Sequence, residues 1–200
     1  DLWTVSTYLM NGSTLNLQPY VDAGKLNVED IDKPMRDIVS LNGDLYAITT
    51  GSLASGVIID SDLFKELGIA MPSNSWTWAD FANTCKEIKA KSNGKYYGCS
   101  DVSGEMMFVE IWVRQYGIPH FTDGLLTEGV EQCYIEWFKM WDDLRKEGAV
   151  PPADYTVNEG WQMEQRAISL GDALMDFNST NKVATYEGVM VNQGHTLEIV

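Results

Sequence analysis

The sequence predicts an α/β protein, and three observations lead to this prediction. Short apolar runs alternate along the chain with longer segments of helical periodicity. Glycine follows several of the helical segments, at the position where a left-handed residue ends a helix. Apolar residues make up 44% of the chain and charged residues 22%, which is typical of a globular protein with a sizeable core.

Residues 1–54 combine irregular segments with one hairpin. We expect a strand at residues 2–5, where the sequence reads Leu-Trp-Thr-Val. Residues 14–24 are expected to be irregular because Pro19 interrupts any regular run. Apolar residues flank Asn42-Gly43, the strongest short turn dipeptide, and this pattern predicts a β-hairpin.

The stretch GVIIDSDLFKELGI at residues 56–69 predicts a strand that runs directly into a helix. Its β-branched run fits a buried strand better than a helix start. Either Asp60 or Ser61 can cap the following helix, whose apolar residues lie at helical spacing. Gly68 stands where a left-handed C-cap ends that helix.

The remaining elements are predicted from caps and periodicity. Thr77 is expected to cap a helix with Asp80 three residues on, as in a capping box. Apolar periodicity predicts further helices at residues 105–116, 128–147 and 158–169, of which 128–147 has the longest apolar stripe. Strands are expected at residues 95–99 and 173–177, and residues 178–200 are expected to be turn-rich with at least one more strand.

The charge of the chain limits its partners. It carries 29 acidic and 14 basic residues, a net charge of −15. Such a chain is repelled by phosphate backbones and by anionic membrane surfaces, so we expect no nucleic-acid partner. No segment approaches the roughly 20 apolar residues of a membrane-spanning helix.

Motifs for covalent or metal chemistry are missing from the sequence. It has no GxSxG, HExxH, P-loop or GxGxxG pattern. Cys85, Cys99 and Cys133 lack metal-ligand spacing, and Cys85 and Cys133 are expected to be small buried hydrophobes. His120 and His195 are expected on the surface or in loops. We therefore predict neither a cofactor nor a metal.

One group of carboxylates leaves an enzymatic alternative open. Asp101, Glu105 and Glu110 lie close together in the sequence, and Glu110 adjoins an apolar run that could raise its pKa. Glycoside hydrolases use paired carboxylates of this kind. The other reading of these residues is an ordinary solvated face of the protein.

Four stretches, in this order, resemble a known family. They are Asp1-Leu2-Trp3, the hairpin LNGDLYAI at residues 41–48, GVIIDSDLFKELGI followed by Pro72 and TWADF at 77–81, and LGDALM at 170–175. The set resembles the extracellular solute-binding proteins of ABC importers, in the family that includes the maltodextrin-binding protein. The match departs from the family pattern at Thr49, where proline is usual, and at Asp60, where asparagine is usual.

The resemblance implies a periplasmic-binding-protein-like (type II) architecture of two lobes that close over a solute by hinge bending. Residues 1–54 correspond to part of the first lobe and residues 55–200 to most of the second, so the chain resembles a middle fragment of a longer protein. The strand at 56–59 is then the crossing between the lobes, and Trp78 a structural anchor beneath the sheet of the second lobe.

The resemblance also implies where a solute binds, in loops at the carboxyl ends of strands. The expected ligand-binding residues are Thr7, Tyr8, Ser52, Ser55, Glu105, Phe108, Asn178 and Ser179. Trp161 could reach the cleft, although helix packing is the better interpretation. Leu53 and Asn181 stand where the maltodextrin binder has an acid and a tryptophan, so its specificity is not expected here.

The function implied by the family is capture of a carbohydrate, such as an oligosaccharide, without catalysis. The protein would be a monomer that delivers its solute to ABC permease subunits. It would act outside the cytoplasm, either lipid-anchored at the cell surface or in the periplasm. The alternatives are a carbohydrate-active enzyme resembling a glycoside hydrolase and a family member that serves as a sugar-sensing domain.

Overall fold

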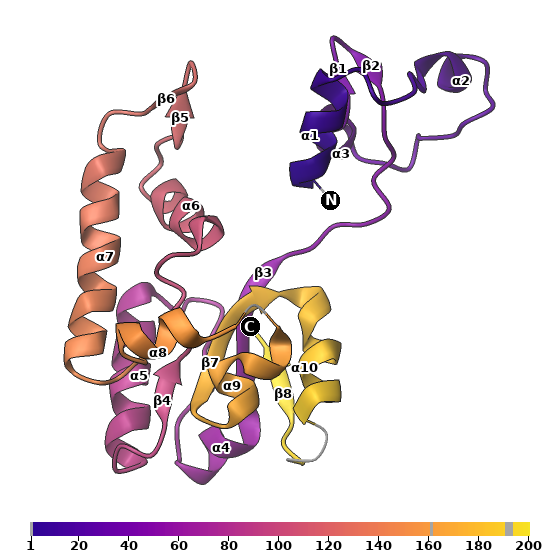
Figure 1. Ribbon diagram of the computed structural model, residues 1–200. Coiled ribbons are helices and arrows are strands. Elements are labelled where there is room, and N and C mark those ends of the chain that lie inside the picture. Colours follow the sequence, from indigo (N-terminus) through magenta and orange to yellow (C-terminus); the bar gives the residue numbers. More distant parts are fainter. Residues whose placement is uncertain (1, 161, 191–193) are drawn as a thin grey trace. The chain divides into compact units, whose positions relative to one another are not determined.

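The protein divides into two compact units, Asp1–Ser52 and Leu53–Val200, in a computed structural model that describes residues 2–160, 162–190 and 194–200 (Figure 1). The mixture of helices with a central sheet confirms the predicted α/β class. Each unit has a hydrophobic core of its own.

The first unit contains three short helices and a hairpin. These are α1 (Leu2–Met10), α2 (Gln18–Asp22), α3 (Lys33–Asp37), β1 (Ser40–Leu41) and β2 (Asp44–Leu45). The hairpin prediction is confirmed, because β1 and β2 pair antiparallel around Asn42 and Gly43, whose φ angles of 54° and 91° are both positive. The core of this unit is formed by Val28, Val39 and Leu45.

Two predictions for the first unit are wrong. The strand expected at residues 2–5 is the start of α1, in which Val5 packs against the core of the unit and Leu9, one helical turn later, is buried. The irregular segment at 14–24 contains α2, since Pro19 occupies its first turn, where a missing N–H breaks no hydrogen bond. Asp1 of the first family motif lies outside the described residues.

A four-stranded sheet organises the second unit. Its strands are β3 (Ser55–Asp60), β4 (Tyr97–Cys99), β7 (Ala173–Ser179) and β8 (Leu197–Ile199), in the spatial order β4-β7-β3-β8. Strand β3 pairs antiparallel with both β7 and β8, whereas β4 and β7 are parallel. The strands predicted at 56–59, 95–99 and 173–177, and the further strand within 178–200, are thereby confirmed.

Helices cover both faces of this sheet. They are α4 (Ser61–Glu66), α5 (Trp78–Lys91), α6 (Met106–Gln115), α7 (Val130–Lys146), α8 (Ala153–Asn158), α9 (Ala167–Leu170) and α10 (Val183–Met190), with the 3-10 turns η1 (Met163–Gln165) and η2 (Thr180–Lys182). A small hairpin, β5 (Phe121–Thr122) with β6 (Leu125–Leu126), precedes α7. Neighbouring residues of β3 point to opposite faces: Ile59 enters the larger core, and Ile58 packs with α9 and α10.

The predicted caps are present. The Asp60 carboxylate accepts the Leu63 N–H at 2.9 Å and so caps α4. Gly68 has a φ of 62° just beyond that helix, the left-handed conformation that glycine adopts without strain. Thr77 and Asp80 form a reciprocal capping box at the start of α5.

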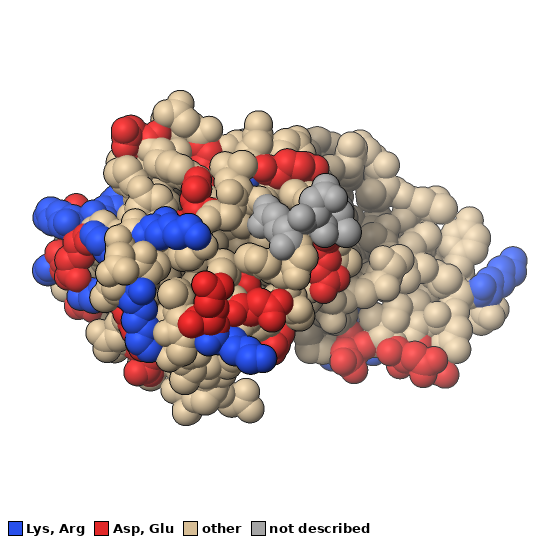
Figure 2. Space-filling view, turned by 90° about the horizontal axis from the view of Figure 1, so that it is seen from below, with Lys and Arg blue, Asp and Glu red and all other residues tan. Residues whose placement is uncertain are grey.

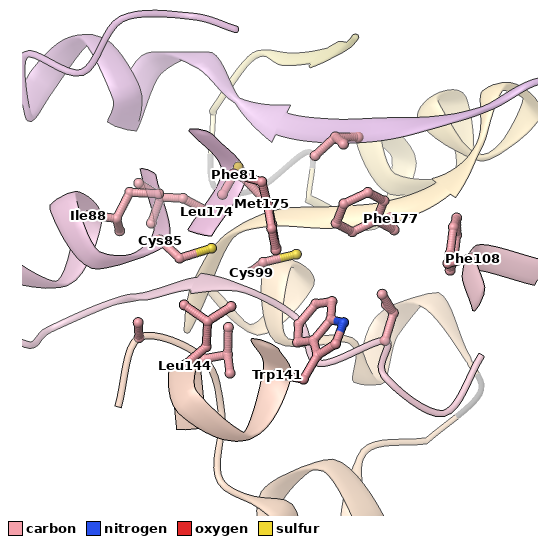
Figure 3. Packing of buried hydrophobic residues seen from close by; sticks show 14 of the residues in the cluster. Phe81, Cys85, Ile88, Cys99, Phe108, Trp141, Leu144, Leu174, Met175 and Phe177 are labelled. Atoms are coloured by element: carbon pink, nitrogen blue, oxygen red, sulfur yellow. The ribbon is translucent and has the colours of Figure 1, made fainter. Parts of the chain in front are cut away.

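The large core joins α5, α6 and α7 to the sheet (Figure 3). The Trp78 ring stacks on Phe177 at 5.4 Å and makes edge contacts with Phe81, Trp112 and Trp137, which is the packing role predicted for it. Cys85 and Cys133 are buried as predicted, and Cys99 is buried with them. Burial raises the pKa of the Cys85 and Cys99 thiols, which therefore remain neutral at neutral pH.

The last third of the chain differs from the prediction in two places. Residues 158–169 do not form one helix: α8 ends at Asn158, and η1 and α9 follow separately. The Glu159 carboxylate accepts the Ala167 N–H at 2.6 Å and so folds this segment back on itself. Helix α10 occupies part of the segment 178–200, for which turns and a strand are expected, and its Tyr186 and Met190 are buried one helical turn apart.

Candidate functional site

The carboxyl ends of β4 and β7 lie at the same edge of the sheet because these strands are parallel. Strand β3 is antiparallel to β7 and therefore begins at that edge, where Ser55 is paired with Ser179. The first turn of α6 reaches the same place, since the Ser55 hydroxyl lies 3.5 Å from the Met107 sulfur. We call this place the sheet edge. It brings together residues from three separate parts of the sequence.

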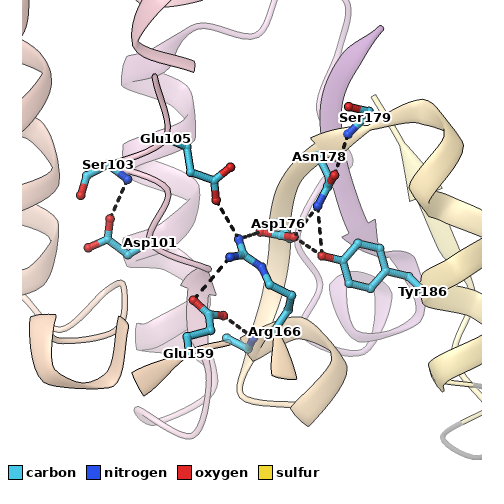
Figure 4. A network of polar contacts seen from close by, with 10 residues as sticks. Asp101, Ser103, Glu105, Glu159, Arg166, Asp176, Asn178, Ser179 and Tyr186 are labelled. Atoms are coloured by element: carbon cyan, nitrogen blue, oxygen red, sulfur yellow. Dashed lines mark hydrogen bonds and ion pairs between the residues drawn. The ribbon is translucent and has the colours of Figure 1, made fainter. Parts of the chain in front are cut away.

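A buried guanidinium links side chains of the sheet edge (Figure 4). Arg166 lies just before α9 and is 8% exposed. Its Nη2 donates to Asp176 Oδ1 at 2.7 Å and to Glu105 Oε1 at 3.4 Å. Its Nη1 lies 3.7 Å from Glu159 Oε2. Arg166 thus contacts the loop before α6, the loop after α8 and strand β7.

Asp176 extends the network to the end of β7. Its Oδ2 accepts the Tyr186 hydroxyl and, at 3.5 Å, the Asn178 side-chain amide. The same amide lies 3.3 Å from the Tyr186 hydroxyl, and Asn178 Oδ1 accepts the Ser179 N–H at 2.9 Å. Asp176 is fully buried on the face of the sheet that carries α9 and α10. These contacts hold the Asn178 side chain at the sheet edge.

The electrostatics of this cluster are dominated by its carboxylates. Burial raises the pKa of Glu105 and that of Glu159, although the nearby guanidinium opposes the rise. Burial alone would lower the pKa of Arg166, but Asp176, Glu159 and Glu105 raise it, so this group stays charged. When the acids are ionised, three carboxylates surround one guanidinium.

The three carboxylates of the enzymatic hypothesis each have a different partner. Asp101 pairs with Arg145 and accepts the Ser103 N–H, whereas Glu105 pairs with Arg166. Glu110 lies 3.9 Å from the half-buried His120. No group of three or more His, Cys, Asp or Glu side chains is placed to hold a metal ion in the part of the chain that the structure describes.

An apolar groove adjoins the sheet edge. It has a volume of about 520 Å³, and its walls include Ser55, Trp76, Trp78 and Ile111. Phe108 also lines the groove but is only 1% exposed and packs against Phe177. Phe108, predicted to bind ligand, is therefore almost fully buried in this structure.

The other predicted residues are distributed over both units. Ser55 is exposed, whereas Glu105, Asn178 and Ser179 are half-buried at the sheet edge. Thr7, Tyr8 and Ser52 are exposed residues of the first unit. Trp161 lies outside the described residues.

The sequence interpretation did not identify Arg166, Asp176, Glu159 or Tyr186. One signal was available for Asp176, which stands within the apolar run Ala-Leu-Met-Asp-Phe. A charged residue in a buried strand needs a partner, and here that partner is Arg166.

The fold is similar to that of solved ABC solute-binding proteins. A substrate-binding protein from Listeria monocytogenes, in complex with cycloalternan, superimposes with a TM-score of 0.80 at 18% identity, over 98% of this chain and 49% of its own. The GacH receptor of Streptomyces glaucescens, solved with acarbose, gives 0.74 at 15% identity, over 100% and 49%. A family 1 solute-binding protein from Alicyclobacillus acidocaldarius gives 0.72 at 21% identity, over 100% and 48%.

These likenesses confirm the predicted type II periplasmic-binding-protein fold, and the chain spans about half the length of the structures it matches. Among the helices of the described residues, none has the length and apolar character needed to cross a bilayer. The sequence profile of the bacterial extracellular solute-binding proteins matches residues 3–196. The chain therefore belongs to the family of bacterial extracellular solute-binding proteins.

Proposed function

We propose that the protein is the carbohydrate-capturing component of an ABC importer and that it binds an uncharged saccharide, such as an oligosaccharide, without altering it. The observation that supports this proposal is the sheet edge, where carboxylate, amide and hydroxyl groups adjoin an apolar groove walled by tryptophans. Saccharides present hydroxyl groups in their ring plane and C–H groups on their faces, so they need both kinds of surface.

The charge of the sheet edge supports an uncharged solute. Three carboxylates around one guanidinium leave an excess of negative charge, which repels phosphorylated or carboxylated sugars. The ligand contacts in the second unit would be Ser55, Glu105, Asn178 and Ser179. Thr7, Tyr8 and Ser52 stay predicted contacts on sequence grounds alone.

The proposal includes the biological setting of the family. Residues 1–54 would form part of the first lobe and residues 55–200 most of the second. The protein would work outside the cytoplasm, lipid-anchored or periplasmic, as a monomer that passes its solute to permease subunits. Cycloalternan and acarbose, which are bound in two of the similar solved structures, suggest oligosaccharides as the first solutes to test.

A thermal-shift screen tests the proposal. The protein is incubated with maltotriose, cellotriose, triacetylchitotriose, acarbose and cycloalternan, and in separate wells with amino acids, polyamines and trigalacturonate. We expect at least one neutral oligosaccharide to raise Tm in a concentration-dependent way, because it binds the folded state only, and trigalacturonate to have no effect.

Two controls accompany the screen: variants of the candidate site, and chromatography of the sugar after binding. Glu105→Gln and Asn178→Ala should weaken the response, whereas Glu110→Gln, whose carboxylate lies beside His120, should leave it unchanged. Chromatography of the recovered sugar should show no cleaved product. Shifts produced only by amino acids or polyamines would overturn the carbohydrate assignment, and a cleaved product would overturn binding without catalysis.

A further inference from the structure

Two of the proposed ligand contacts, Glu105 and Asn178, come from different secondary-structure elements and are connected by one buried group. Glu105 stands at the start of α6, and Asn178 is the penultimate residue of β7. Their sequence positions give no reason for a fixed mutual orientation. Arg166 supplies one, because its guanidinium contacts Glu105 directly and Asp176 beside Asn178 (Figure 4).

The contact to Glu105 is direct and involves one side-chain oxygen. Glu105 Oε1 accepts from Arg166 Nη2 at 3.4 Å, and the Glu105 side chain is 30% exposed. One carboxylate oxygen is thus engaged by the protein while Oε2 remains for a ligand hydroxyl.

The contact to Asn178 runs through Asp176. Arg166 Nη2 holds Asp176 Oδ1 at 2.7 Å, and the other oxygen of this carboxylate meets the Tyr186 hydroxyl and the Asn178 amide. The Asn178 amide nitrogen is directed at Asp176 and Tyr186, at 3.5 and 3.3 Å, and these contacts favour one orientation of its side chain.

Arg166 is itself held from the opposite side. Its Nη1 lies 3.7 Å from Glu159 Oε2, and the second oxygen of Glu159 accepts the Ala167 N–H at 2.6 Å. The Glu159 side chain is 2% exposed. Because a guanidinium is planar and its nitrogens have fixed spacing, anchoring Nη1 determines where Nη2 can lie.

We propose that Arg166 is a positioning residue of the ligand site, which orients Glu105 directly and Asn178 through Asp176. This inference rests on the proposed function, since it assigns Arg166 a role in solute binding by that same site. A ligand that meets side chains already held in place loses less conformational entropy on binding. A lysine at this position keeps the charge but offers one nitrogen, which cannot contact Glu105, Asp176 and Glu159 in the same planar arrangement.

The test is isothermal titration calorimetry with maltotriose and triacetylchitotriose on the wild type and on Arg166→Lys. We expect Arg166→Lys to weaken binding by roughly tenfold or more, the consequence of losing a charge-assisted hydrogen bond. The matched control is Arg145→Lys, because Arg145 pairs with the buried Asp101 but contacts neither Glu105 nor Asn178. The control should retain wild-type affinity.

A double-mutant cycle separates positioning from a general loss of structure. If Arg166 acts through Glu105, part of the effect of Arg166→Lys on affinity should disappear in a Glu105→Gln background. Equal effects in both backgrounds would overturn the proposal, as would wild-type affinity in Arg166→Lys. Absence of binding of either sugar to the wild type, after a screen without saccharide hits, would overturn the proposed function and this inference together.

A second variant serves if Arg166→Lys does not fold. Glu159→Gln removes the charge that holds Nη1 but keeps a carbonyl oxygen to accept the Ala167 N–H. We expect Glu159→Gln to weaken binding by less than Arg166→Lys does. Part of its effect on affinity should likewise disappear in a Glu105→Gln background. Wild-type affinity in Glu159→Gln would then overturn the proposal.

Discussion

At the scale of single residues, the buried charges of the second unit explain how polar groups can lie inside an apolar fold. Asp176 is fully buried, and this costs hydration energy. Hydrogen bonds from Arg166, Tyr186 and Asn178 offset part of that cost. Removing Arg166 would leave the buried Asp176 carboxylate without its counter-charge, which makes this cluster sensitive to substitution.

Glu105 should make the stability of the protein depend on pH. Its pKa is raised above the ordinary value of 4.5, chiefly by burial, so the folded state favours the protonated form. The contribution of Glu105 to stability is therefore complete below pH 4.5 and is lost as the pH rises through the raised pKa. In urea unfolding, the free energy of unfolding of the wild type minus that of Glu105→Gln should fall from acidic to neutral pH. The exposed Glu128→Gln is the control, and a difference that rises with pH would contradict this prediction.

At the scale of elements, the approach of β4 to α5 depends on a missing side chain. Gly98 lies in β4, and a Cβ at this position would lie 2.5 Å from the Cβ of Cys85 and closer still to its backbone Cα. Real Cβ atoms do not approach other atoms so closely, and the backbone of α5 cannot swing aside as a flexible side chain would. Gly98 therefore sets the distance between helix and strand in the large core.

Gly98→Ala should destabilise the protein by about 1–3 kcal/mol, the usual cost of overpacking a core. Gly104→Ala is the matched control, since its added Cβ would meet no atom within 4 Å. Urea unfolding of both variants beside the wild type checks the prediction. Equal stability of the two variants would show that α5 and β4 can separate at little cost.

At the scale of the whole molecule, the net charge of −15 means that acidic side chains repel one another over the whole chain. Figure 2 shows acidic side chains interspersed with lysines and arginines on one face. In α7, exposed pairs of opposite charge lie one helical turn apart, such as Lys139 with Asp143 and Lys146 with Asp142. Exposed pairs of this kind contribute little to stability, so the unpaired acids leave a net self-repulsion in the folded chain.

Sodium chloride should therefore raise Tm at neutral pH, with most of the gain at low ionic strength, because salt screens the repulsion between acids. The control is the same titration near the sequence pI of 4.3, where the net charge vanishes and added salt should change Tm little. Differential scanning calorimetry measures both series. A Tm that does not respond to salt at neutral pH would contradict the prediction.

Elements with local signals could be predicted from the amino-acid sequence. The Asn42-Gly43 hairpin, the Asp60 cap and the Thr77–Asp80 capping box each involve residues within three positions of one another, so no distant contact is needed to form them. The long apolar stripe of residues 128–147 likewise predicted α7. Local signals gave the wrong element at residues 2–5, where Val5 of α1 packs against a core built from distant residues.

The composition of the candidate site depends on contacts between residues that are far apart in the sequence. Glu105 and Asn178 could be predicted from the resemblance to a family, but Arg166 and Glu159 could not, because neither stands in a recognisable motif. Their role depends on the parallel pairing of β4 with β7 and on the chain reversal after α8. Charges far apart in a sequence interact only after the sheet has brought them together, and burial then sets both their pKa values and their partners.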